Sequence, residues 1–293
     1  MDFISQMLLM GTGGDQGGDY LAVSHELSPF ITIYKRSGDT FIKLANPSAL
    51  PVGFLAYGVA FSSDGAYLAV THDASPFITI YKRSGDTFTK LSDPATLPTG
   101  ACSGAAFSSD GTYLAVTHVN TPYITIYKRS GDTFTKLSDP GELPTFTAYS
   151  PSFSPDGTYL AVGHVNTPYI TIYKRSGDTF TKLSNPATLP ASDAFGAGFS
   201  PDGTYLAVAH VNTPYITIYK RSGDTFTKLS DPATLPTGDG IGVSFSGDGT
   251  YLAMAHISTP YIAIYKRSGD TFTKLSNPSD LPTGDGVGVS FYP

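Results

Sequence analysis

The fold is decided by residues 195–230, which read FGAGFSPDGTYLAVAHVNTPYITIYKRSGDTFTKLS. The turn signals Ser-Pro-Asp-Gly and Ser-Gly-Asp, together with Pro214, interrupt this stretch. Between them lie short segments rich in β-branched and aromatic residues, which are typical of strands. No sustained apolar spacing of the helical kind is present. The stretch therefore predicts four short strands, at 195–199, 205–210, 215–219 and 226–229.

The same pattern recurs along the chain. Phenylalanine ends the first predicted strand of each copy at intervals of 46 residues, at Phe61, Phe107, Phe153, Phe199, Phe245 and Phe291. Tyrosine begins the second predicted strand six times, and one extra residue lies in the loop between Pro51 and Tyr57. The histidines and the basic residues obey the same period, so no isolated histidine or basic group is left over to suggest a special site.

Four short strands every 46 residues are typical of one blade of a β-propeller. The sequence therefore predicts an all-β fold, a six-bladed β-propeller of four-stranded antiparallel blades. Residues 20–293 form this single propeller, and residues 1–19 form an N-terminal arm with a glycine-rich linker.

The two ends of the repeat predict how the ring closes. The first blade, residues 20–45, has no strand before it that matches the first strand of the other copies. Residues 287–291 do match such a first strand, but no blade follows them. We expect residues 287–291 to pair with residues 20–25 and complete the first blade, which would hide two strand edges. Glycine recurs in the first strands, and this predicts that these strands crowd together, at Gly58, Gly104, Gly196, Gly242 and Gly288.

Two segments carry a resemblance to known repeats. The run FSPDGTYLAV at 199–208, followed by ITIYK at 216–220, resembles the WD40 repeat, although Tyr219 and Lys220 stand where that repeat has Trp-Asp. The signature IYKRSGDTFTKL resembles tandem-repeat propellers of bacteriophages and bacteria. The first resemblance implies a propeller, and the second implies a virion-associated protein.

Composition argues against several classes of partner. The net charge is −6 with a pI near 5.4, which argues against a nucleic acid or an anionic membrane as partner. The single cysteine, Cys102, can form no intrachain disulfide. No apolar run is long enough for a transmembrane helix, and the first ten residues lack the basic start of a signal peptide. Localisation is left open, except that the phage resemblance implies a virion.

Three groups of residues suggest chemistry, and each has a simpler structural interpretation. The six histidines share one repeat position and suggest a metal ring, but their expected separation is too great for zinc, so we interpret them as structural. The repeated Lys220-Arg221 pair suggests a polyanion site, yet Asp224 lies close enough to offset it. We interpret Asp193, Asp239 and Asp285 as turn residues. The sequence predicts no catalytic, cofactor-binding or metal-binding residue and hence no enzyme.

The candidate binding residues lie in loops that differ between copies. The loop before each first strand varies most, and it carries aromatic or acidic residues at Phe54, Tyr57, Phe146, Tyr149, Asp193 and Phe195. Such loops on a rigid scaffold are common binding sites, and neutral drift at tolerant positions is the alternative. The N-terminal arm is a second candidate, as an apolar anchor formed by Phe3, Ile4, Met7, Leu8, Leu9 and Met10.

These features favour a structural or protein-interaction module, in a phage tail, a capsid decoration or a receptor-binding role. A protein partner or self-association would use the arm or the variable loops. The alternative is a glycan-binding propeller whose aromatic loops contact sugars. No cofactor, nucleic acid or membrane partner is expected.

Overall fold

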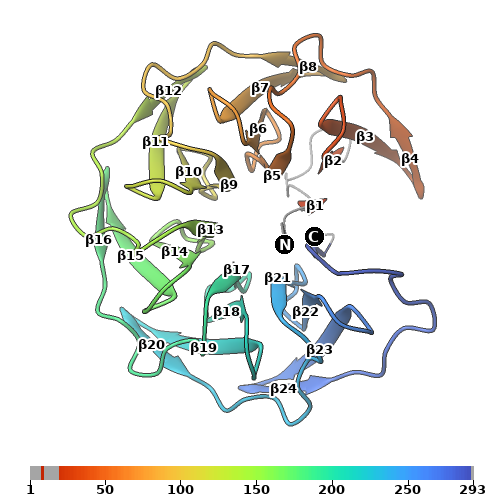
Figure 1. The fold of residues 1–293 in the computed structure, drawn as a ribbon, viewed down its shortest axis with the longest axis vertical. Helices are drawn as coiled ribbons and strands as arrows, with labels where there is room; N and C mark the ends of the chain where they lie inside the picture. Colours follow the sequence, from red (N-terminus) through yellow and green to blue (C-terminus); the bar gives the residue numbers. More distant parts are fainter. Residues whose placement is uncertain (1–7, 10–19, 292–293) are drawn as a thin grey trace. The chain divides into compact units, whose positions relative to one another are not determined.

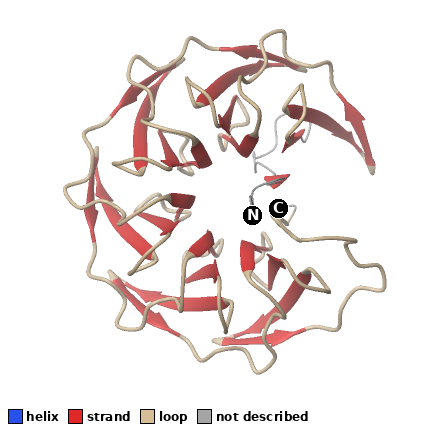
Figure 2. Cartoon of the chain, viewed as in Figure 1, coloured by secondary structure: helices blue, strands red, loops and turns tan. Residues whose placement is uncertain are grey.

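The computed structural model describes residues 8–9 and 20–291, and every regular element within them is a β-strand (Figure 2). None of the described elements is a helix that could cross a membrane. The chain falls into two compact units, residues 1–139 and 140–293, and each is considered by itself below.

The first unit contains three four-stranded antiparallel sheets. Within each sheet the strands are hydrogen-bonded in sequence order, as Figure 1 shows. Their bounds are β1 Leu8–Leu9, β2 Tyr20–Ser24, β3 Ile31–Ser37 and β4 Thr40–Lys43; β5 Ala56–Phe61, β6 Tyr67–His72, β7 Ile78–Ser84 and β8 Thr87–Lys90; and β9 Cys102–Phe107, β10 Tyr113–His118, β11 Ile124–Ser130 and β12 Thr133–Lys136.

The second unit contains three further sheets of the same kind. Their bounds are β13 Ala148–Phe153, β14 Tyr159–His164, β15 Ile170–Ser176 and β16 Thr179–Lys182; β17 Ala194–Phe199, β18 Tyr205–His210, β19 Ile216–Ser222 and β20 Thr225–Lys228; and β21 Gly240–Phe245, β22 Tyr251–His256, β23 Ile262–Ser268 and β24 Thr271–Lys274. The described chain is thus all-β, with six four-stranded blades, and the predicted β-propeller fold is confirmed.

Both faces of a blade are apolar because each is covered by a neighbouring blade. In the second strand β18, Leu206 and Val208 pack against the blade before it, whereas Tyr205 and Ala207 pack against the blade after it. Successive side chains of a strand point to opposite faces, so a nearly continuous apolar run is what a sheet buried on both faces requires. All four side chains are at most 3% exposed.

The first strands of neighbouring blades converge within each unit (Figure 1). A Cβ atom added to Gly58 would lie 3.1 Å from Gly104 Cα, and one added to Gly196 would lie 2.8 Å from Ile241 O. Ordinary Cβ contacts are longer than this, so the predicted crowding of the first strands is confirmed.

The prediction that residues 287–291 pair with residues 20–25 and complete the first blade is wrong. Residues 287–291 form no strand, and the first strand of that blade is β1, with Leu8 paired to Val23 and Leu9 to Ala22. A partner only about ten residues upstream closes a far shorter loop than the opposite end of the chain, so its pairing costs less entropy. Leu8 and Leu9 therefore act as a strand; Phe3, Ile4, Met7 and Met10 lie outside the described residues.

The C-terminal segment instead lies along β21 in its own unit. Phe291 N donates to Ser244 Oγ at 3.2 Å, as Phe199 N donates to Ser152 Oγ at 3.3 Å between two complete blades. Gly286 N also donates to His256 O at 3.0 Å. The segment thus contacts β21 as the first strand of a following blade would.

Candidate binding site

Each first strand from β5 onward contains a β-bulge near its start. In β13, Ala148 pairs with His164 and Ser150 with Gly163, so Tyr149 is the extra residue of the bulge. A bulge re-aims the side chain of the extra residue away from the regular alternation, and bulges are common beside functional sites. The residues at this position are Tyr57, Ser103, Tyr149, Phe195 and Ile241, and they differ in size although the scaffold around them is nearly uniform.

The structure brings together two of the predicted binding residues. The rings of Tyr149 and Phe195 have centroids 4.7 Å apart and are tilted by 51°. Both side chains are half-buried, so each keeps some surface open to solvent. Burial, and to a lesser extent the negative charge of Asp193, raise the pKa of the Tyr149 hydroxyl. At neutral pH this hydroxyl is therefore a proton-bearing donor, and it lies near a carboxylate.

Asp193 fixes the loop beside this ring pair. Its Oδ1 accepts a hydrogen bond from Asn166 N at 3.1 Å, and its backbone O accepts one from Val211 N at 3.0 Å. Asn166 has a left-handed backbone with φ of 66°, which asparagine tolerates better than most residues. The carbonyl of Asn166 also accepts a hydrogen bond from Thr145 Oγ1 at 3.3 Å. The turn residue predicted at Asp193 thus ties together three loops of the second unit. We call Tyr149, Phe195, Asp193 and Asn166 the rim.

The remaining predicted loop residues are Phe146 in the second unit and Phe54 and Tyr57 in the first. Phe146 lies in the loop before β13 and is 46% exposed. Phe54 and Tyr57 belong to the first unit, where Phe54 is 82% exposed and its backbone N donates to Asp73 Oδ1 at 2.9 Å. The carbonyl of Tyr57 accepts a hydrogen bond from Ser24 Oγ at 3.1 Å.

Sequence reasoning missed Asn166 and Ile241. Ile241 occupies the bulge position after Phe195, and Val287 stands at the same repeat position in the C-terminal segment. The signal was present, because aligning the copies residue by residue shows that side-chain size varies widely at this position of the first strand, from serine to tyrosine. The β-bulge at this position depends on how the strand pairs with its neighbour, so no local sequence pattern predicts it.

Five of the six histidines have a ring nitrogen within hydrogen-bond distance of a threonine in the third strand of their own blade. His118 Nε2 lies 3.0 Å from Thr125 Oγ1 and its Nδ1 lies 2.8 Å from Asn120 O. The loop arriving from the preceding blade contributes Thr99 Oγ1, which is 3.4 Å from Nδ1. Burial lowers the pKa of His118 to about 4, so the ring is neutral at physiological pH. Within the described part of the chain, no cluster of histidine, cysteine or acidic residues could hold a metal ion.

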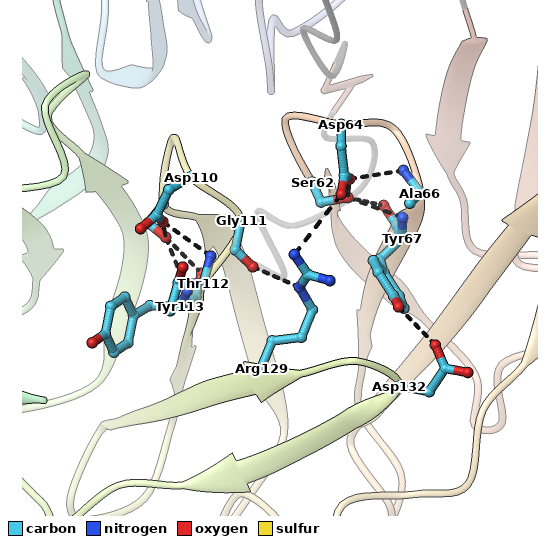
Figure 3. Close-up of polar contacts among 11 residues, drawn as sticks. Ser62, Asp64, Ala66, Tyr67, Asp110, Gly111, Thr112, Tyr113, Arg129 and Asp132 are labelled. Atoms are coloured by element: carbon cyan, nitrogen blue, oxygen red, sulfur yellow. Dashed lines mark hydrogen bonds and ion pairs between the residues drawn. The ribbon is translucent and has the colours of Figure 1, made fainter.

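The repeated basic residues join neighbouring blades (Figure 3). Lys82 Nζ pairs with Asp132 Oδ2 of the next blade at 2.8 Å, and Tyr67 Oη donates to Asp132 Oδ1 at 2.7 Å. Arg129 of that next blade donates through Nε to Gly111 O at 2.7 Å, and its guanidinium lies 4.6 Å from the centre of the Tyr67 ring. Phe134 meets the same ring edge-on at 5.8 Å.

The second unit repeats this arrangement. Asp224, which was predicted to offset Lys220, instead pairs with Lys174 of the preceding blade at 2.8 Å, and Lys220 pairs with Asp270 at 2.7 Å. The charges of these residues thus form pairs between neighbouring blades.

Similar folds occur among solved structures. The chain superposes on hydrazine synthase of Kuenenia stuttgartiensis with a TM-score of 0.67 and 17% identity, over 88% of this chain and 75% of that one. It superposes on the periplasmic gluconolactonase PpgL of Pseudomonas aeruginosa with a TM-score of 0.69 and 13% identity, over 91% and 84%. At these identities the likeness shows the fold alone. No family model and no curated protein matches, so both repeat resemblances stay predictions.

These matches correct the prediction that the chain is not an enzyme. Both superposed proteins carry the names of enzymes, so six blades built in this way are compatible with catalysis. The prediction relied on histidines and charges that repeat in every copy. Repetition of these residues says nothing of chemistry at the positions that vary, and the inference was therefore too broad.

Proposed function

We propose that this chain is a binding module whose rim, at the bulges of β13 and β17, contacts the ligand. The observation that supports this most is the Tyr149–Phe195 pair. Two large aromatic side chains occupy the bulge positions of neighbouring blades and contact each other, whereas β9 and β21 have serine and isoleucine at this position. A rigid scaffold of uniform repeats with variation concentrated at one end is the arrangement expected of a recognition surface.

The test uses two probes, a panel of immobilised oligosaccharides and a displayed library of random peptides. Wild-type protein should retain members of at least one probe set, and Tyr149→Ala and Phe195→Ala should lose them. Thr227→Ala is the control, because Thr227 is exposed on β20, outside the rim. Retention that is unchanged in both rim variants, or no retention at all, would overturn the proposal.

Self-association is the second candidate function, and an exposed apolar group in the first unit favours it. Leu27 is 79% exposed, Val52 44% and Phe54 82%. Leu27 corresponds to Asn166 in the repeat, and Phe54 lies next to the residue that corresponds to Asp193. Ser24 Oγ donates to Tyr57 O at 3.1 Å, so the segment that leads to Leu27 and the segment that follows Phe54 lie side by side. Exposed apolar groups of this kind often mark protein contacts.

Light scattering tests this second candidate. Wild-type protein should form oligomers at micromolar concentration, and the double variant Leu27→Ser, Phe54→Ser should be monomeric. A monomeric wild-type protein would refute self-association through this surface. The virion-associated role implied by the repeat signature stays a prediction. In that role, the exposed apolar surface would contact another protein of the virion.

A further inference from the structure

We propose that the rim binds an uncharged pyranose unit of an oligosaccharide. This inference rests on the proposed function, and it adds the chemical class of the ligand. A pyranose has faces of C–H groups and an edge of hydroxyl groups that both donate and accept hydrogen bonds. A site for it needs an apolar aromatic surface next to fixed polar groups that still have hydrogen-bonding capacity.

The aromatic surface is provided by Tyr149 and Phe195. The face of an aromatic ring carries partial negative charge, and this attracts the weakly positive C–H groups of a sugar. The two rings are tilted by 51° and are therefore not stacked flat against each other. Both keep part of their surface exposed, so a sugar ring can contact them without any rearrangement of the core.

The polar edge is provided by Asp193 and Asn166. The Oδ1 atom of Asp193 is occupied by Asn166 N, whereas Oδ2 has no partner among the described residues. The exposed side-chain amide of Asn166 has none within that part of the chain either. A carboxylate oxygen can accept from two hydroxyls, and an amide can both donate and accept. The backbone bonds to Val211 and Thr145 hold both residues in place, so binding would cost little ordering entropy.

Charge excludes acidic sugars from this position. Among the described residues Asp193 has no ion pair with a lysine or arginine, and the ion pairs of Lys174 and Lys220 are with Asp224 and Asp270. A uronic or sialic acid placed here would bring a second carboxylate close to Asp193 with no counter-charge. An uncharged sugar meets no such repulsion.

The measurement uses the full chain on a panel of immobilised neutral, amino and acidic oligosaccharides, followed by calorimetry with the best neutral member. Phe195→Ala should weaken binding about tenfold, which is the loss expected for one aromatic contact. Phe195→Leu keeps the apolar volume but removes the ring, and it should weaken binding nearly as much. Tyr149→Phe keeps the ring and should bind within about threefold of wild type. Thermal unfolding of each variant separates lost binding from lost folding.

The outcomes separate this inference from the proposed function. Binding of neutral sugars that depends on Phe195 and weakens in Asp193→Asn supports the inference. Retention of acidic sugars alone overturns it. Rim-dependent retention of displayed peptides without sugars also overturns it, although the proposed function survives. Retention of neither probe overturns both.

Discussion

His256 is buried like the other histidines, yet among the residues that the structure describes both of its ring nitrogens lack a hydrogen-bond partner. In the other blades a threonine of the third strand lies within 3.1 Å of Nε2, as Thr217 does for His210. Blade six has Ala263 at that position. A buried polar atom without a partner costs free energy, so a single missing hydroxyl makes this blade locally weaker.

Replacing Ala263 with threonine should restore this bond. Ala263→Thr is expected to raise the free energy of unfolding by about 1 kcal/mol, measured by urea denaturation. Ala263→Val is the matched control, since it adds the branched side chain without the hydroxyl. Thr217→Ala should cost about 1–3 kcal/mol, because it leaves His210 in the state of His256. An equal gain from valine and threonine would show that packing, and not the hydrogen bond, limits this site.

Strand β21 departs from its counterparts in a way that its neighbour β22 compensates. Its first residue is Gly240, where most other blades have alanine, and in the second strand Met254, which pairs with Val243, stands where they have valine. A Cβ atom on Gly240 would lie 2.4 Å from Met254 Cε and 2.6 Å from Tyr215 O. The longer methionine side chain therefore occupies the space that the missing methyl group leaves.

This pair predicts strongly non-additive energetics. Gly240→Ala alone should destabilise the protein by about 1–3 kcal/mol, because it overfills a packed position. Adding Met254→Val should recover the part of that loss that comes from contact with Met254 Cε, whereas the close approach to Tyr215 O remains. A double-mutant cycle followed by urea denaturation measures the coupling. Additive losses would mean that the two positions do not share one space.

Strand-level features were predictable where they depend on local chemistry. The predicted strand at 205–210 coincides with β18, and 195–199 differs from β17 by one residue, because turn residues and β-branched runs fix these limits. The partner of β2 was not predictable from the repeat. The repeat register identifies which strand matches an open sheet edge. It does not compare the loop-closure entropy of pairing that distant strand with the smaller entropy cost of pairing a segment nearer in the sequence.

For the chain as a whole, the periodicity of the sequence predicted the fold and the blade-to-blade apolar contacts. It did not predict that Lys174 pairs with Asp224 in the next repeat, because a motif read within one copy hides contacts made between copies. The candidate site shows the same limit. The variable loops pointed to Tyr149 and Phe195, whereas their pairing and the role of Asn166 arise from the bulges and turns of two blades.

The repeated histidines predict how the whole protein responds to acid. Burial lowers the pKa of His72 and of His118 to about 4, and it lowers those of His164, His210 and His256 as well. In the unfolded chain these groups bind protons below about pH 6.5, whereas in the folded protein His72 and His118 do so only near pH 4 and the other three only at a lower pH than when unfolded. Stability is therefore complete above pH 6.5 and falls as the pH is lowered from 6.5 to 4. His72 and His118 each contribute up to about 3 kcal/mol to this loss.

The urea midpoint should accordingly decrease steadily between pH 6.5 and about 5, above the range in which the carboxylates of the unfolded chain protonate. His72→Gln should be less stable at pH 7, since it disturbs a buried hydrogen-bonded site, but its stability should depend less on pH across this window. The exposed change Thr227→Ala is the control and should leave the slope unaltered. A midpoint that stays constant down to pH 4.5 would show that the histidines protonate in the folded state without cost. Their buried rings would then have to reach solvent.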